Sequence, residues 1–317
     1  MPAPLLEDKA LDVKRDKVGI SYSGGGPLLL IELGIAQAFV EMGIVPTAIA
    51  GVSAGAMAAV AHGLDPVDGE GIALAADALA NVSNKTLKLT LGEIVLNDVW
   101  DLKHLAGLGR NDSLKKVLSG VFLKKVGKER ITANYFARTR RLPQVYLGAT
   151  DRITGDAYWF KGNDDVADAL VASSAIPFVF PAKNMDVRGE SRVFVDGGVV
   201  SNQPLSVLAL RGCGTIYACA VGYDGDKMKA PTNLVDNGMQ SIFIMIHESS
   251  RLEQAYVQGR MGKAGVIHHI HPVVAFPISG FNFDPKSIKS VMLAAKEATK
   301  DWIRKKHLRP GEKGYVA

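Results

Sequence analysis

The chain has 317 residues, of which 47% are hydrophobic and 22% are charged, and its formal net charge is +5. This composition supplies enough apolar surface for a large core and excludes a chain that is disordered throughout. The basic excess is mild, so it fits an ordinary basic surface as well as contact with an anionic partner. Length alone fits one large domain or two ordinary ones.

The first 16 residues mix acidic and basic side chains without a long apolar run, and we expect a flexible N-terminal arm rather than a secretory signal. No uncharged apolar run reaches the roughly 18 residues that a membrane-spanning helix needs. The two cysteines, Cys213 and Cys219, are separated by six residues of a predicted strand, which places their sulfurs roughly 15–20 Å apart, too far for a disulfide. Free thiols favour a reducing compartment, so we expect a cytoplasmic protein.

The first readable unit is VGISYSGGGPLLLIELGIAQAF, from Val18 to Phe39. A short apolar run, three glycines and a helical pattern follow one another, with Pro27 in the first helical turn, where a missing N–H costs nothing. Thr47 to Ala50 predicts a second strand, followed by GVSAG and a helix from Ala54 to about His62. Two such units in close succession predict parallel strands with a right-handed crossover, the start of an α/β sandwich.

Residues from about 64 to 142 have helical runs rich in lysine, which predict a helical insertion or lid that leaves the sheet and rejoins it. The segment QVYLGATDRITGDAYWF then predicts a hairpin, and RVFVDGG and TIYACAVG predict further strands. A helix from about Asn233 to Arg260, the strand-like VIHHIHPVVAF and a helix from Pro285 to about Lys305 complete the chain. We therefore expect one α/β domain over residues 17–317.

GVSAG places Ser53 between Gly51 and Gly55 in the pattern G-x-S-x-G. A nucleophile at a sharp strand-to-helix turn needs glycines on both sides, because side chains there would collide with neighbouring backbone. The turn also sets the serine hydroxyl at a helix N-terminus, whose partial positive charge favours a developing anion. The predicted strand before the motif and helix after it make Ser53 a candidate nucleophile.

A nucleophilic serine needs a base, and the sequence offers two kinds. Late histidines stand at His247, His268, His269, His271 and His307. They would follow the order of an α/β-hydrolase, although that fold places its elbow after more strands than the two found here.

The other candidate base is Asp196 in FVDGG, at the end of a predicted strand, where Gly197 and Gly198 release the chain into a turn. If that strand runs parallel to the strand before Ser53, both end at the same sheet edge and Asp196 approaches Ser53. An aspartate that only starts a turn is the simpler interpretation.

Four motifs in order, SGGG before a helix, GVSAG, ASSAIPFVFP and VDGGVVSNQP, together resemble the patatin-like phospholipases, from about Lys17 to Val221. The resemblance implies a three-layer α/β/α sandwich of the patatin type with a mainly parallel sheet. It also implies a Ser–Asp dyad without histidine, with Ser53 as nucleophile and Asp196 as base. The implied oxyanion loop consists of three glycines, Gly24, Gly25 and Gly26.

Such a dyad implies a serine acyl hydrolase that cleaves acyl esters of phospholipids, lysophospholipids or simple esters, without a cofactor or metal. Asp196 would take the Ser53 proton while glycine amides stabilise the oxyanion. One position departs from the family, whose glycine run usually continues to an Arg or Lys where this chain has Leu28. A catalytically weak lipid-binding protein and a histidine-dependent α/β-hydrolase esterase therefore stand as alternatives.

Other features have ordinary explanations beside their functional ones. The glycine run partly matches a dinucleotide-binding fingerprint, but Leu29 occupies the third glycine position, which argues against a bound nucleotide. We also expect no nucleic-acid partner. His269 and His271 lack a carboxylate or cysteine at ligand spacing, which argues against a metal. Residues 112–131 carry an apolar face among lysines, which predicts either a packed surface helix or a lid in peripheral contact with an anionic membrane. Ser173 and Ser174 are expected to cap or pack near the cleft.

Overall fold

The computed structural model describes residues 11–83 and 111–309, except residues 178, 229, 233 and 279–281. Most of the expected N-terminal arm and residues 84–110 of the expected insertion lie outside this part. The strands of the described part are β1 (Lys14–Tyr22), β2 (Ala48–Val52), β3 (Gln144–Asp151), β4 (Ala157–Trp159), β5 (Lys183–Val187), β6 (Glu190–Val195), β7 (Cys213–Cys219) and β8 (Val266–Ile270). They form one sheet in the order β5-β6-β3-β2-β1-β7-β8, with β4 paired to β3.

The centre of the sheet is parallel and one edge is antiparallel. Strands β3, β2, β1, β7 and β8 run in one direction, whereas β4, β6 and β5 pair in antiparallel fashion. The predicted mainly parallel sheet is therefore confirmed. The expectation that the strand before Asp196 is parallel is wrong, because Val195 of β6 pairs antiparallel with Thr150 of β3. Since β6 overlaps only the last two residues of β3, its carboxyl end still lies at the edge where the parallel strands end.

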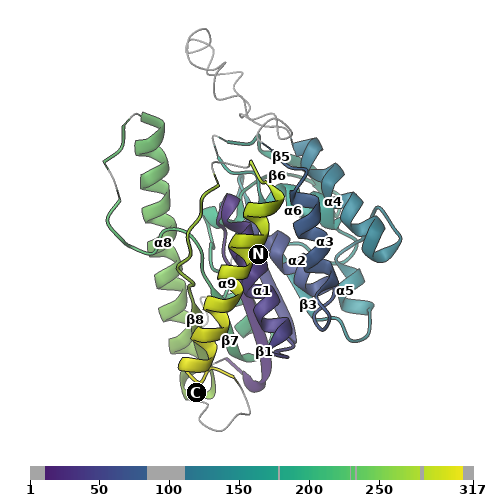
Figure 1. Cartoon of the computed structure of the whole chain (residues 1–317). Coiled ribbons are helices and arrows are strands. Elements are labelled where there is room, and N and C mark those ends of the chain that lie inside the picture. The colour runs from purple at the N-terminus through teal and green to yellow at the C-terminus, as the bar shows by residue number, and fades with distance from the viewer. Residues whose placement is uncertain are drawn as a thin grey trace.

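Helices cover both faces of the sheet. The helices of the described part are α1 (Leu29–Glu41), α2 (Ala54–Leu64), α3 (Glu70–Leu79), α4 (Asn111–Val126), α5 (Asn134–Arg138), α6 (Val166–Ser173), α7 (Ser206–Leu210), α8 (Leu234–Met261) and α9 (Pro285–Lys305). Figure 1 shows α1 and α9 side by side, and they pack closely against each other. On the sheet, Ile20 and Ile49 belong to the core beneath α1, α2 and α9, whereas Ala48 and Ala50 belong to the core beneath α7 and α8. This alternation gives three α/β/α layers.

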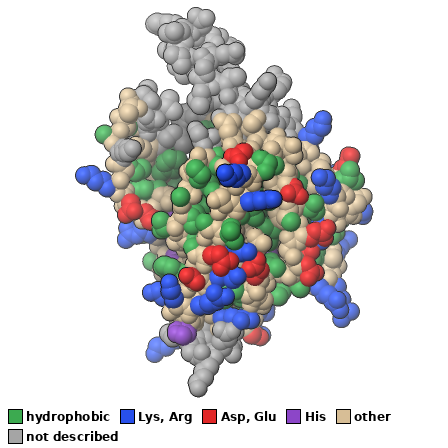
Figure 2. All heavy atoms as spheres, in the orientation of Figure 1, with side chains coloured by type: hydrophobic (Ala, Val, Ile, Leu, Met, Phe, Trp, Pro, Cys, Tyr) green, Lys and Arg blue, Asp and Glu red, His purple; other side chains and the backbone are tan. Residues whose placement is uncertain are grey.

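The described part of the insertion packs back onto the body. Helix α4 lies against α3 and α6, and its Val121 and Phe122 are buried. Its apolar face is thus turned into the protein. No described helix is both long and apolar enough to cross a membrane. Both cysteines are buried and free. On the face shown in Figure 2, Lys and Arg side chains are interspersed with Asp and Glu rather than gathered in one basic patch.

Candidate active site

Ser53 sits in a strained turn between β2 and α2. Its backbone has φ 54° and ψ −126°, a left-handed conformation that costs a non-glycine residue on the order of 1–3 kcal/mol. Two hydrogen bonds through Ser173 hold the turn in place. The Ser53 N–H donates to Ser173 Oγ at 2.8 Å, and Ser173 Oγ donates to the Gly148 carbonyl at 2.6 Å. Ser53 is buried, with 4% of the residue exposed. Ser173 therefore has a positioning role in the elbow.

The two flanking glycines are required by close backbone contacts. A Cβ on Gly51 would lie 2.1 Å from the Gly55 carbonyl oxygen, and a Cβ on Gly55 would lie 2.4 Å from the Tyr22 carbonyl oxygen. Neither neighbour is a flexible side chain that can move aside. A larger residue at position 51 would therefore open the elbow itself, and one at position 55 would push it away from β1, the strand that precedes the glycine loop.

Asp196 is held at the end of β6 by contacts through its backbone and one carboxylate oxygen. Its N–H donates to the Ala175 carbonyl at 2.9 Å, and its carbonyl accepts from Thr150 Oγ1 at 2.9 Å. The Oδ1 atom accepts from the Gly198 N–H at 2.8 Å. A Cβ on Gly197 would lie 2.5 Å from the Gly148 carbonyl, so only glycine lets this turn approach the ends of β2 and β3 so closely.

Ser53 and Asp196 line one cleft of about 530 Å³, together with all three residues of the glycine run. Burial raises the pKa of Asp196 to about 6, while the Ser53 hydroxyl and the Gly198 N–H favour the carboxylate and limit the rise. The Oδ2 atom is buried and has no hydrogen-bond partner among the described residues. The site therefore holds a carboxylate that is ionised at neutral pH and has an oxygen left over to take a proton.

The three glycines of the loop after β1 are not equivalent. The Gly24 N–H donates to both the backbone oxygen and Oδ1 of Asn202, each at 3.1 Å. Within the described part of the chain, no acceptor bonds the N–H of Gly25 or Gly26. A Cβ on Gly24 would lie 2.4 Å from Asn202 Oδ1 and 3.2 Å from Ser53 Cβ. Glycine at position 24 thus lets the loop pack closely against Asn202 and Ser53. The loop amides that remain available to a ligand in the cleft are those of Gly25 and Gly26.

Asn202 and Gln203 are residues that the sequence reasoning missed. While Asn202 bonds Gly24, the Gln203 side-chain amide donates to the Ser21 carbonyl at 3.0 Å and to Ser21 Oγ at 2.9 Å. They tie the loop after β6 to the end of β1. Both belong to VDGGVVSNQP. The two adjacent amide side chains of this motif were the sequence signal that could have identified them as hydrogen-bonding residues of the site.

No cation lines the cleft among the described residues. Leu28, which stands where the family usually has Arg or Lys, is half-buried, lines the cleft and donates its N–H to the Gly25 carbonyl at 3.1 Å. The leucine side chain therefore packs at the glycine loop where a positive charge was expected.

None of the late histidines lines the cleft, although His247 packs edge-on against Tyr223, which does. His268 is buried, and burial lowers its pKa to about 4, whereas His271 pairs with Asp224 at 3.4 Å. Across the described ranges, no group of three His, Cys, Asp or Glu side chains is arranged to hold a metal ion.

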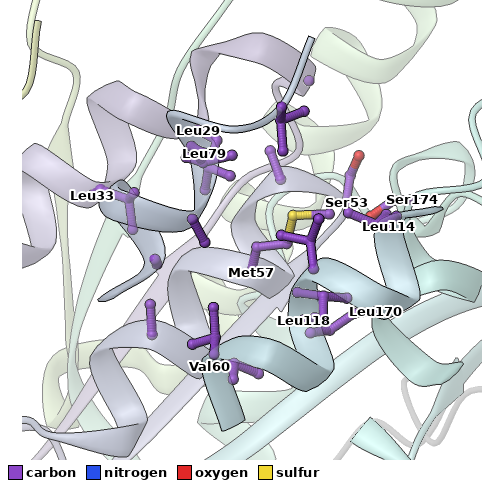
Figure 3. Close-up of a pocket in the computed structure, with 18 of the residues that line it drawn as sticks. Leu29, Leu33, Ser53, Met57, Val60, Leu79, Leu114, Leu118, Leu170 and Ser174 are labelled. Carbon is purple, nitrogen blue, oxygen red and sulfur yellow. The ribbon is translucent and has the colours of Figure 1, made fainter. Parts of the chain in front are cut away.

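A second, narrower cavity of about 90 Å³ also begins at Ser53. It lies between α2, α3, α4 and α6, and its polar lining among the described residues consists of Ser53 and Ser174. Figure 3 shows these two serines at one end of the cavity, with Met57 and Leu118 further along and Val60 at the far side. The apolar face of α4 is a wall of this cavity, so Ser53 lies between a wide cleft and a narrow apolar one.

Comparison with known proteins gives one family. A model of the patatin-like phospholipases matches residues 20–209. Two relatives named as uncharacterized NTE family proteins, from Mycobacterium bovis and Mycobacterium tuberculosis, are each 27% identical over 192 residues. The match covers 60% of this chain and 28% of each relative, so this chain spans only part of their length. The crystal structure of VipD from Legionella pneumophila is 15% identical with a TM-score of 0.46, over 94% of this chain and 68% of VipD.

Proposed function

Because the chain belongs to the patatin-like phospholipase family, we propose that it is a serine acyl hydrolase that cleaves acyl esters with Ser53 as nucleophile and Asp196 as base. Family membership supports lipolytic activity, and the geometry of this pair supports the assignment of roles. The observation that carries the proposal is the elbow serine in one cleft with a buried carboxylate whose Oδ2 has no partner among the described residues.

The first half of the proposed reaction forms an acyl-enzyme. Asp196 Oδ2 takes the proton of Ser53 as Oγ attacks the ester carbonyl carbon, which forms a C–O bond and places the negative charge on the carbonyl oxygen. The amides of Gly25 and Gly26 stabilise that oxyanion. The N–H of Ala54 adds to them, because the first residue of α2 has no acceptor within its own helix. The carbonyl then re-forms, the alcohol leaves, and Asp196 returns the proton to it.

The second half releases the acid. Asp196 deprotonates a water molecule, which attacks the acyl carbonyl through the same oxyanion geometry, and the proton passes to Ser53 Oγ as the acyl bond breaks. A base with a pKa of about 6 is stronger than an ordinary carboxylate and is still ionised at neutral pH. This pKa supports aspartate in both steps without a histidine.

We assign the whole of residues 17–317 to one hydrolase domain, with the insertion at about 64–142 contributing α3, α4 and α5. The substrate class is acyl esters of phospholipids, lysophospholipids or simple esters, met in the cytoplasm or at an anionic membrane surface. Since the cleft has no cationic lining among the described residues, recognition rests on the acyl ester more than on a phosphate.

The test is release of fatty acid from a panel of p-nitrophenyl esters and phospholipids by the wild-type protein, Ser53→Ala and Asp196→Asn. Ser241→Ala is the matched control, because Ser241 is an exposed serine of α8 whose hydroxyl donates to the Asn237 carbonyl of the same helix. We expect activity in the wild type and in the control, and loss in the two site variants. A fluorophosphonate probe should label the wild type and not Ser53→Ala. Folded wild-type protein that neither turns over an ester nor reacts with the probe would instead be a lipid binder.

A further inference from the structure

We propose that Glu253 of α8 is a positioning residue for the reaction, and that it acts by holding the segment from which Asn202 fixes the glycine loop. The proposal rests on the acyl hydrolase function given above and extends the site beyond the family match. That match ends at residue 209, whereas Glu253 lies in the helix that begins at Leu234. The C-terminal third of the chain thus helps to shape the active site.

The carboxylate of Glu253 bonds three groups, and all three lie in one short segment of the chain. Its Oε2 atom accepts from the Ser201 hydroxyl at 2.7 Å. Its Oε1 atom accepts from the N–H groups of Leu205 and Ser206 at 3.2 Å and 2.9 Å. Hydrogen bonds to a carboxylate are stronger than those between neutral groups. Glu253 therefore ties both ends of the segment 201–206 to α8.

Two residues inside this segment hold the glycine loop. Asn202 accepts from the Gly24 N–H through its backbone oxygen and through Oδ1, and the Gln203 side chain donates to the Ser21 carbonyl. Both residues lie between the two points that Glu253 holds. A shift of the segment would therefore move the glycine loop with it, and with that loop the amides proposed to stabilise the oxyanion.

Helix α8 is a firm support at the level of Glu253, beside β8 in Figure 1. Towards the helix C-terminus, Val257 and Met261 are buried in the core beneath α7 and α8. There Gln258 Oε1 also accepts from the N–H of Ile267 in β8 at 3.1 Å. Towards the N-terminus, the helix contributes three apolar side chains to the cleft wall. Glu253 thus lies between the part of α8 that is fixed on the sheet and the part that lines the cleft.

The first test compares two glutamates of α8 in the hydrolysis of a p-nitrophenyl ester. Glu253→Ala should lower kcat about tenfold with little change in KM, because a displaced glycine loop weakens oxyanion stabilisation more than substrate binding. Glu253→Gln keeps an oxygen for the two N–H groups and should retain most of this kcat. Glu248→Ala is the matched control and should leave kcat unchanged, since Glu248 is exposed and pairs with Arg251 in the same helix. An unchanged kcat in folded Glu253→Ala, or a rise in KM alone, would overturn the proposal.

A double-mutant cycle tests the route of the effect. If Glu253 acts through Asn202, Glu253→Ala should lower kcat much less in the Asn202→Ala background than in the wild type. Ser201→Ala removes one of the three donors and should show the same coupling with a smaller loss, so it serves as the test if Glu253→Ala does not fold. Losses that simply multiply in the folded double variant would refute the positioning role.

Hydrogen exchange at the Gly24 amide gives a measurement that does not depend on turnover. This N–H is bonded to Asn202, so Glu253→Ala should speed its exchange by about tenfold, whereas Glu248→Ala should leave it unchanged. Unchanged exchange in folded Glu253→Ala would contradict the proposal. If exchange speeds up as expected but the wild type cleaves no ester, the hydrolase function fails and the role of Glu253 in holding the loop stands.

Discussion

The burial of Asp196 predicts that removing its charge stabilises the protein while abolishing turnover. The pKa of this carboxyl lies near 6 in the folded chain, against an ordinary value of 3.8. Between these two pH values the folded state binds more protons than the unfolded state, so lowering the pH through 6 adds stability until about pH 3.8. Above pH 6 the buried carboxylate is charged and that stability is absent.

The size of this effect follows from the two pKa values. At about 1.4 kcal/mol per pH unit, a pKa raised from 3.8 to about 6 corresponds to roughly 3 kcal/mol at pH 7. Asp196→Asn keeps an oxygen for the Gly198 N–H and carries no charge. We therefore expect this variant to be inactive at pH 7 and more stable than the wild type there, by up to about 3 kcal/mol.

The assay is urea unfolding of both proteins at pH 7 and at pH 4, with ester hydrolysis measured on the same samples. At pH 4 the wild-type carboxyl is protonated, so the difference in unfolding free energy between the two proteins should shrink to a small remainder. A stability gain of equal size at both pH values would refute the electrostatic reasoning. So would a difference in unfolding free energy that does not shift in favour of Asp196→Asn between pH 4 and pH 7.

Other consequences of the site geometry can be checked by standard kinetics and unfolding. The kcat/KM of the wild type should fall about tenfold per pH unit below a midpoint near 6, and a midpoint near 4 would mean that burial does not act on Asp196. Asn202→Ala removes a side-chain acceptor of Gly24 and should lower kcat about tenfold with little change in KM, as measured in steady state. Ser53→Gly should be inactive, yet about 1–2 kcal/mol more stable in urea than Ser53→Ala, because glycine adopts φ 54° without strain. Replacing His247 or His268 by Gln should leave the pH profile unchanged, whereas loss of turnover in a folded variant would restore a histidine base.

Local signals in the sequence predict some elements almost to the residue. The helix expected from Pro285 to about Lys305 is α9, and its start is well defined because the Asp284 side chain accepts from the N–H groups of Lys286 and Ser287. The predicted hairpin of β3 and β4 is likewise present, with Gly155 at φ 75° in its turn. In these cases the residues that determine the element are neighbours in the chain.

Features that depend on distant pairing could not be predicted in the same way. The direction of β6 depends on its pairing with β3, more than 40 residues earlier, and its apolar pattern is identical for either direction. Strand β5 was missed because its two-residue turn to β6 is Arg188-Gly189, with Arg188 at φ 55°, where Asn or Gly is the usual signal. The sequence also could not predict which glycine amides are free to bind a ligand, because the Gly24 N–H is bonded by Asn202, 178 positions away.

The same span has a consequence for the order in which the protein becomes active during synthesis. The glycine loop and the elbow of Ser53 leave the ribosome before Asn202, which bonds Gly24 and follows it by 178 positions. At roughly 5–20 residues per second, this interval lasts on the order of 10–35 s. Between the synthesis of Ser53 and that of Asp196, the nascent chain carries the proposed nucleophile without its proposed base and without the bonds that hold the glycine loop. A ribosome-bound fragment that ends before β6 is therefore expected to be chemically silent, and activity begins only when the sheet has closed around both loops.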